Sequence, residues 1–338
     1  MSLEDLIRAM PKAELHIHLE GSIQPATLLE LARRNGVPLA EDVAGLRALY
    51  EFRDFAHFIE VYTLIQSCLR TRDDWTLVVC DLGRELARQN VRYAEVTFTP
   101  RPDRGTPLPY PDILAGIEAG RAEIARTYGV EMRWLPDAVR DHGPRAALEV
   151  ADLAIVARGR GVVGLGLGGS ENLFPPELFA AAFARAHAAG LYAYPHAGEL
   201  AGPASIWGAL RALHADRIGH GVRAIEDPAL LAYLREHQIT LDICPTSNIR
   251  LHVYPSYEAH PLRRLYEAGV PVTINTDDPP LFNTDLIHEY ELAAHVFGFS
   301  ARELMALSLN AVRASFLPPA EKARLAQEFE AQWARLPA

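Results

Sequence analysis

The feature that most constrains the fold is a repeated alternation of short apolar runs with longer segments of helical periodicity. Eight short runs have the length and the flanking turn residues of buried strands. Helical patterns separate them, and Pro or Asp opens several of these patterns, as the first turn of a helix favours. The predicted strands span residues 14–20, 91–99, 130–136, 162–168, 191–196, 217–220, 240–244 and 270–276. The predicted helices span residues 25–34, 55–68, 75–88, 111–128, 175–189, 206–214, 229–237 and 261–268.

This alternation predicts an α/β protein with a parallel sheet. Eight strand–helix units over 338 residues match a single-domain (β/α)8 TIM barrel. A doubly wound open sheet is the alternative, because periodicity does not show whether the sheet closes. Neither a Gly/Ser/Pro-rich linker nor a block of charge divides the chain, so we expect residues 1–338 to form one domain.

The composition permits this fold and excludes several classes of protein. Hydrophobic residues make up 49% of the chain, which supplies a sizeable core. The formal net charge of −10 and the lack of a Lys/Arg block argue against nucleic acid as a partner. Residues 1–10 do not resemble a signal peptide, and no apolar run is long enough to span a membrane. Three scattered cysteines fit a reducing compartment, so we expect a cytoplasmic protein.

Polar motifs lie where four of the predicted strands end. In a parallel barrel the C-terminal ends of the strands converge at one mouth, so we expect the active site there. The first motif is His16-Ile17-His18. Strand alternation sends both imidazoles to the same face, where they can bind one cation. A buried, hydrogen-bonded pair of core histidines is the alternative.

The second motif, His-Ala-Gly-Glu at residues 196–199, adds a third imidazole and a carboxyl. The flexible Gly198 allows Glu199 to turn inward, although an ordinary strand-to-helix turn with a solvated Glu199 is the alternative. The third motif, Arg-Ile-Gly-His-Gly at residues 217–221, holds His220 between two glycines. Glycines on both sides allow a ligand to approach the backbone closely, but they also suit an ordinary structural turn.

The fourth motif is Asn-Thr-Asp-Asp-Pro at residues 275–279, after a β-branched run. Two adjacent buried carboxylates repel each other, and a divalent cation held by one of them would compensate. A surface helix cap is the alternative. Three histidines and one aspartate form a nitrogen and oxygen ligand set suited to Zn2+. Glu199, His220 and Asp278 then remain for acid, base and orienting roles, with His220 and Asp277 deprotonating a water that attacks an electron-poor carbon.

Taken together, the motifs resemble the adenosine/adenine deaminase family of the amidohydrolase superfamily. The resemblance covers nearly the whole chain, in the family's motif order, and implies a (β/α)8 barrel with one Zn2+ per chain that hydrolytically deaminates purines at C6. The matching segments are residues 11–21, 196–199, 217–221, Cys-Pro-Thr-Ser-Asn at 244–248, and 275–279.

The resemblance also implies a role for each matched residue. Glu199 would protonate purine N1, His220 would stabilise the attacking hydroxide, and Asp278 would hold N7. Residues 162–169 look like the family segment that offers a backbone N–H to purine N3, which makes Gly169 the candidate. His18 would lie beside the substrate as well as binding zinc. The implied zinc ligands are His16, His18, His196 and Asp277.

Glu20 is a candidate substrate-binding residue and bears on the choice of substrate. Adenosine deaminases usually carry Asp after His-x-His-Leu, where it meets the ribose 5′-hydroxyl, whereas this chain has Glu20. Adenine deaminases and bacterial aminodeoxyfutalosine deaminases resemble the chain here, and the latter also resemble it at residues 52–62 and 90–100. We therefore expect conversion of aminodeoxyfutalosine to futalosine in menaquinone biosynthesis. Adenosine, adenine and N6-substituted adenine are the rival substrates.

The extended substrate ends in a carboxyphenyl ketone, which requires an aromatic surface and a cation. An apolar stripe at helical spacing is a candidate wall, although such a stripe also suits a plain core. The stripe comprises Phe52, Phe55, Phe58, Ile59 and Tyr62. Candidate cations for the carboxylate are Arg101, Arg250 and His252. A metal-dependent phosphoesterase and a catalytically inactive binding module are the alternatives from other classes, and the oligomeric state is not readable.

Overall fold

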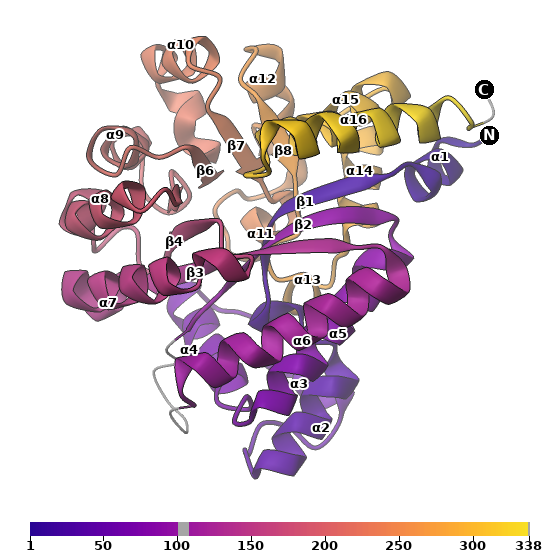
Figure 1. The fold of residues 1–338 in the computed structure, drawn as a ribbon. Helices are drawn as coiled ribbons and strands as arrows, with labels where there is room; N and C mark the ends of the chain where they lie inside the picture. Colours follow the sequence, from indigo (N-terminus) through magenta and orange to yellow (C-terminus); the bar gives the residue numbers. More distant parts are fainter. Residues whose placement is uncertain (101–107, 337–338) are drawn as a thin grey trace.

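The structure, a computed structural model, describes residues 1–100 and 108–336. Eight parallel strands follow one another around a single sheet in chain order. Figure 1 shows them at the centre of the molecule, with helices packed around them. The strands are β1 (Lys12–His18), β2 (Val91–Phe98), β3 (Glu131–Val139), β4 (Gly164–Gly168), β5 (Tyr192–Ala197), β6 (Arg217–His220), β7 (Thr240–Ile243) and β8 (Val272–Ile274).

Helices connect each strand to the next. The β1–β2 connection is the most elaborate, because α2 to α5 all lie within it (Figure 1). The α-helices are α1 (Leu3–Ala9), α2 (Pro25–Asn35), α3 (Val43–Leu49), α4 (Phe55–Gln66), α5 (Arg72–Arg88), α6 (Tyr110–Tyr128), α7 (Gly143–Val156), α8 (Ala180–Ala188), α9 (Pro203–Ala212), α10 (Pro228–Glu236), α11 (Pro245–Arg250), α12 (Leu262–Glu267), α13 (Pro279–Phe282), α14 (Leu286–His295), α15 (Ala301–Ala314) and α16 (Pro319–Trp333). Short 3-10 helices are η1 (Glu20–Ser22), η2 (Arg140–His142), η3 (Arg158–Arg160), η4 (Pro176–Phe179), η5 (Val222–Glu226) and η6 (Tyr257–Ala259).

The sheet closes on itself between β8 and β1. Ile17 and Asp277 form a parallel bridge just beyond the end of β8. The N–H of His18 donates to the carbonyl of Asp277 at 2.9 Å, and the N–H of Asp277 donates to the carbonyl of His16 at 3.1 Å. The side chain of Asn275 accepts a further bond from the N–H of His16 at 3.2 Å. The predicted (β/α)8 barrel is therefore confirmed, and the open sheet is excluded.

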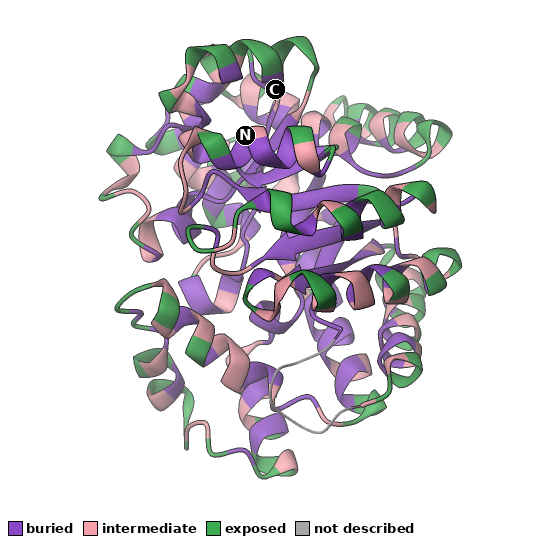
Figure 2. Ribbon diagram, turned by 90° about the vertical axis from the view of Figure 1, so that its left-hand side faces the viewer, coloured by how far each residue is buried: buried purple, intermediate pink, exposed green. Residues whose placement is uncertain are grey.

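The strands are apolar because helices cover the outside of the barrel and side chains fill its inside. Figure 2 shows the strands as buried, with exposed residues on the outer faces of the helices. At the N-terminal end of the barrel, Arg217 pairs with Glu95 at 2.6 Å and with Asp242 at 2.5 Å. Its guanidinium also lies 4.5 Å from the centre of the Tyr194 ring. This packed layer closes the floor beneath the mouth where the polar motifs gather.

Element boundaries differ slightly from the prediction. β1 ends at His18 and Glu20 begins η1, because Leu19 already has a helical backbone. The helix predicted at residues 175–189 starts as η4 and continues as α8. No helix in the described parts of the chain is long and apolar enough to cross a membrane.

Candidate active site

The C-terminal ends of β1, β5, β6 and the β8 connection bring four histidines and a carboxylate together. The ring centre of His16 lies 4.6 Å from that of His196 and 4.5 Å from that of His220. Asp277 Oδ1 lies 3.2 Å from His16 Nε2 and 3.1 Å from His18 Nε2. These side chains form overlapping groups of three whose nitrogen and oxygen atoms lie within 4.8 Å of one another. One cation can bridge donors at that spacing.

Backbone strain accompanies two of these residues. His220 has φ 61° and Asp277 has φ 66°, a left-handed conformation that costs a non-glycine residue about 1–3 kcal/mol. The bridge to Ile17 holds Asp277 in place, and Ser247 Oγ donates to its Oδ2 at 2.6 Å. Strain of this kind persists only where surrounding contacts maintain it, and here it places both side chains at the cluster.

His16 and His196 each present an Nε2 atom to the centre of the cluster. Tyr194 Oη lies 2.7 Å from His16 Nδ1, which leaves His16 Nε2 facing the cluster. His196 Nε2 is buried, and among the described residues it has no hydrogen-bond partner, while His16 Nε2 faces Asp277 Oδ1. Buried polar atoms are normally paired. Imidazole nitrogens beside a carboxylate oxygen therefore fit a bound divalent metal, and Zn2+ takes this donor set.

The pKa values of the cluster residues bear on whether they can bind a cation. Burial lowers the pKa of His196 well below its ordinary value, and burial followed by the charge of His16 lowers the pKa of His220 to about 3. Burial opposes ionisation of Asp277, but His16 and the hydrogen bonds from His16 and His18 hold its pKa well below the usual range. Burial likewise opposes the charged form of His18, yet Asp278 and Asp277 raise its pKa to about 10. The cluster thus holds one carboxylate and two neutral imidazoles, those of His196 and His220, while His18 must give up its proton to bind a cation.

Burial favours the protonated form of two carboxyl groups beside the cluster. Burial, followed by the charge of Asp277, raises the pKa of Glu199 well above its ordinary value. The same two causes raise the pKa of Asp278. Glu199 Oε2 lies 3.6 Å from His220 Nε2, while Glu199 Oε1 and Asp278 Oδ1 have no partner within the described part of the chain. Both groups can donate a proton or a hydrogen bond into the site.

The turn that carries Glu199 is held by Glu171, which the sequence analysis did not single out. Its carboxylate accepts bonds from the N–H groups of Gly198, Glu199, Leu200 and Ala201 at 2.5, 3.1, 2.8 and 3.0 Å. Four N–H groups converging on one carboxylate form a nest for an anion. Glu171 lies in a loop after β4 without periodicity, so only the folded chain reveals this contact.

The motif at residues 244–248 also supports the site. Asn248 Nδ2 lies 3.4 Å from His220 Nδ1, and Asn248 Oδ1 lies 3.0 Å from His260 Nε2. Arg140 Nη2 donates to the carbonyl of His196 at 2.7 Å. These bonds orient the inner residues from behind, as outer partners of metal-site histidines do.

The cluster opens into a cavity of about 730 Å3, counting the space at its mouth. Residues of the predicted wall line one side, namely Phe55, Phe58, Ile59 and Tyr62 of α4. Phe52 instead packs behind them, with its ring centre 5.3 Å from Phe58 and 6.0 Å from Phe282. Gly169, with φ 94°, lines the cavity at the end of β4. The aromatic stripe therefore serves both as wall and as core.

Glu20 lies behind this wall. Its Oε2 accepts a bond from Tyr62 Oη at 3.3 Å, and its Oε1 accepts bonds from Thr99 N at 2.9 Å and Gln66 Nε2 at 3.5 Å. Glu20 is fully buried, and burial raises its pKa. The structure thus ties Glu20 to the residues of the wall, and its contact with substrate stays a prediction.

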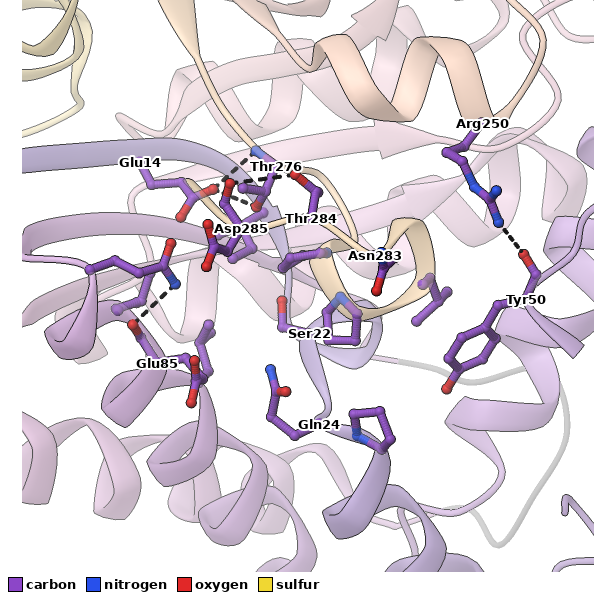
Figure 3. A pocket seen from close by; sticks show the side chains of 18 of the residues that line it. Glu14, Ser22, Gln24, Tyr50, Glu85, Arg250, Thr276, Asn283, Thr284 and Asp285 are labelled. Atoms are coloured by element: carbon purple, nitrogen blue, oxygen red, sulfur yellow. Dashed lines mark hydrogen bonds between the residues drawn. The ribbon is translucent and has the colours of Figure 1, made fainter. Parts of the chain in front are cut away.

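The candidate cations occupy different places. Arg101 lies outside the described residues, and His252 is exposed. Arg250 lines a second cavity, shown in Figure 3, where its Nη2 donates to the carbonyl of Tyr50 at 3.0 Å. Arg250 therefore faces away from the cavity that contains the histidine cluster.

The second cavity is larger, at about 1340 Å3 by the same measure, but no histidine is among the described residues that line it. It lies between β1, α5 and the segment that carries α13. On its wall, Glu14 Oε1 accepts bonds from Thr276 N at 3.0 Å and Thr276 Oγ1 at 2.5 Å (Figure 3). Within residues 1–100 and 108–336, none of the groups able to hold a metal includes Glu14. The smaller cavity is therefore the candidate active site, and Glu14 supports the segment leading to Asp277.

Fold and site together define a (β/α)8 enzyme with a histidine–carboxylate cluster at the C-terminal mouth of its barrel. The sequence profile of adenosine deaminase matches residues 11–332, so the chain belongs to the adenosine deaminase family. It is a hydrolase of carbon–nitrogen bonds in cyclic amidines, and its family is metal-dependent. The predicted family is confirmed, which removes the phosphoesterase alternative.

Relatives of this chain match over nearly their whole length. It is 44% identical over 333 residues to aminodeoxyfutalosine deaminase of Streptomyces avermitilis, covering 97% of this chain and 92% of that one. It is similar in structure to adenine deaminase from Arthrobacter aurescens, with a TM-score of 0.91, 34% identity, and coverage of 97% and 100%. An amidohydrolase from Burkholderia ambifaria, solved with bound zinc, gives a TM-score of 0.90, 30% identity, and coverage of 99% and 95%.

Proposed function

We propose that the chain is a zinc-dependent deaminase that hydrolyses the C6 amino group of an adenine nucleoside. Its preferred substrate is aminodeoxyfutalosine. The product is futalosine, an intermediate of menaquinone biosynthesis. The observation that carries the proposal is one cavity lined by both the cation cluster and two buried carboxyl groups, those of Glu199 and Asp278. The 44% identity to the Streptomyces avermitilis enzyme supports the choice of substrate. The three cysteines, all buried and unpaired, support a cytoplasmic location.

The residues proposed to hold one zinc ion are His16, His18, His196 and Asp277. Three imidazole nitrogens and one carboxylate oxygen leave a position open for water. The buried Nε2 atom of His196, which has no partner in the described chain, and the contacts of His16 and His18 with Asp277 support this ligand set. When bound, the metal acidifies a water molecule and so supplies a nucleophile at neutral pH.

In the proposed reaction, residues of the chain transfer the protons and orient the attacking water. Glu199 donates its proton to purine N1, which makes C6 electrophilic. His220, neutral because its pKa is near 3, orients the attacking water, and Asp277 accepts a proton from it. The water oxygen then bonds to C6. The amino group takes up the proton from Asp277 and leaves as ammonia, while the new hydroxyl returns a proton to Glu199, leaving a 6-oxopurine.

Other residues position the substrate. Asp278 in its protonated form donates a hydrogen bond to N7, and the backbone N–H of Gly169 donates to N3. The cavity wall from α4 packs against the aryl end of the extended substrate. Arg101 is the proposed partner of the aryl carboxylate.

Ammonia release from aminodeoxyfutalosine, adenosine and adenine tests the proposal. We expect kcat/KM to be highest for aminodeoxyfutalosine and clearly lower for adenosine. Deamination of adenine is the second candidate, favoured by the structural likeness to the Arthrobacter aurescens adenine deaminase. Fastest turnover of adenine with an inert extended nucleoside would reject the preferred substrate and leave the C6 chemistry in place.

A further inference from the structure

We propose that Asp137 on β3 binds a ribose hydroxyl of the substrate. The inference rests on the proposed function and adds a sugar contact to it. Asp137 lines the same cavity as the histidine cluster and is only 5% exposed. Its Oδ1 atom has no hydrogen-bond partner in the described chain. A buried oxygen left unpaired inside a substrate cavity indicates a partner that arrives with the substrate.

Space for this carboxylate is built into the neighbouring strand. Asp137 pairs with Gly166 across β3 and β4. A Cβ atom added to Gly166 would lie 2.5 Å from Asp137 Oδ1, and one added to Gly168 would lie 2.8 Å from Oδ2. Any larger residue at either position would displace the carboxylate. The glycine repeat of β4 therefore has a second use besides the close approach expected at Gly169.

The protein stabilises the charged form of Asp137 only weakly. Burial raises the pKa of Asp137 to about 7, with Glu20 acting in the same direction. His18, Arg140 and the N–H of Gly168 oppose this rise. Asp137 is also absent from the metal-binding groups found among the described residues. Its oxygen is thus available to a ligand rather than to the cation.

The order of strands places Asp137 on the sugar side of the purine. The proposed metal ligands and proton donors come from β1, β5, β6 and the segment after β8, whereas β2, β3 and β4 form the wall between β1 and β5. With C6 at the metal cluster and N3 at Gly169 after β4, the adjacent N9 and its sugar face that wall. Glu20, which replaces the Asp that meets the ribose 5′-hydroxyl in adenosine deaminases, is occupied by Tyr62, Gln66 and Thr99. Asp137 supplies a carboxylate in its stead.

Substrate analogues combined with two variants test the contact. We would measure kcat/KM of the zinc-loaded wild type, Asp137→Ala and Asp137→Asn on adenosine, 2′-deoxyadenosine, 3′-deoxyadenosine and adenine. Asp137→Ala should lower kcat/KM for adenosine by about 10–100-fold, the usual effect of losing a hydrogen bond to a charged group. The deoxy analogue that lacks the contacted hydroxyl should be turned over almost equally by the wild type and Asp137→Ala. Asp137→Asn keeps an acceptor oxygen and should recover part of the loss.

Controls separate this contact from a general role. Zinc content and thermal midpoint should be unchanged in both variants, and Asp152→Asn, at an exposed ion pair with Arg185, should behave as the wild type. Equal losses on all four substrates would overturn the proposal, as would a loss greatest for adenine, whose N9–H would then be the donor. Calorimetric binding of inosine and its 2′- and 3′-deoxy analogues gives the same comparison without turnover. Failure of the proposed deamination would therefore remain distinguishable from failure of this contact.

Discussion

Replacing Glu171 by Gln tests whether Glu199, the proposed general acid, depends on a residue that does not touch the substrate. In the structure Oε1 accepts the N–H of Gly198, while Oε2 accepts those of Glu199, Leu200 and Ala201. Glutamine retains one acceptor oxygen and puts an NH2 group where the other oxygen was. The variant therefore loses at least one charge-assisted hydrogen bond, each worth about 1.5–3 kcal/mol. The new NH2 group also faces a backbone N–H, and two donors cannot form a hydrogen bond.

The loss should appear mainly in the chemical step. A tilt of the 198–201 turn moves the Glu199 carboxyl away from N1, and misplacement by about 1 Å can cost about 100-fold. We expect kcat to fall by about 10–100-fold with a smaller change in KM, and zinc content to be retained. Steady-state kinetics and elemental analysis of Glu171→Gln, with Asp152→Asn as the surface control, provide the measurement. An unchanged kcat, or equal losses of zinc and activity, would refute this reasoning.

The remaining predictions concern the inner carboxyls and the support of β8. Glu199→Gln should keep zinc and lose about 10²–10⁴-fold in kcat, because Gln has the shape of the acid without its proton; near wild-type turnover would rule out this role. Asp277→Ala should lose zinc with activity, whereas Asp278→Asn should lose activity alone, and equal zinc loss would contradict separate roles. Burial raises the pKa of Glu14 to about 8 from an unfolded value near 4.5. The folded state therefore binds more protons between these values, and the free energy of unfolding should fall as pH rises through them, by at most about 1.4 kcal/mol per pH unit. Denaturant titrations of Glu14→Gln should show a flatter pH dependence, and an unchanged slope would contradict the assignment.

The parts of the site that the sequence predicts are those attached to strand ends. The alternation of His16 and His18 and the adjacency of Asp277 and Asp278 are local, and the barrel topology alone brings them together. The supports behind them depend on contacts between distant segments. Glu171 reaches across to residues 198–201, a contact that no local pattern records.

The sequence does not show in which direction a side chain points, and the predictions for single residues fail for this reason. Phe52 and Phe58 share one apolar stripe, yet Phe58 lines the cavity and Phe52 packs behind it. Arg250 follows a site motif but turns toward Tyr50, on the side of the second cavity. Asp137 carries no motif, and its position depends on the register that pairs it with Gly166.

Hydrolysis in water enriched with oxygen-18 tests the central claim most directly. Zinc-loaded enzyme would be incubated with aminodeoxyfutalosine, adenosine or adenine, and the purine fragment of the product analysed by mass spectrometry alongside released ammonia. We predict one ammonia per turnover and one solvent oxygen in the 6-oxopurine, with both signals abolished by chelation and restored by Zn2+. Turnover that releases no ammonia, or a product whose purine carries no solvent oxygen, would contradict hydrolytic deamination at C6.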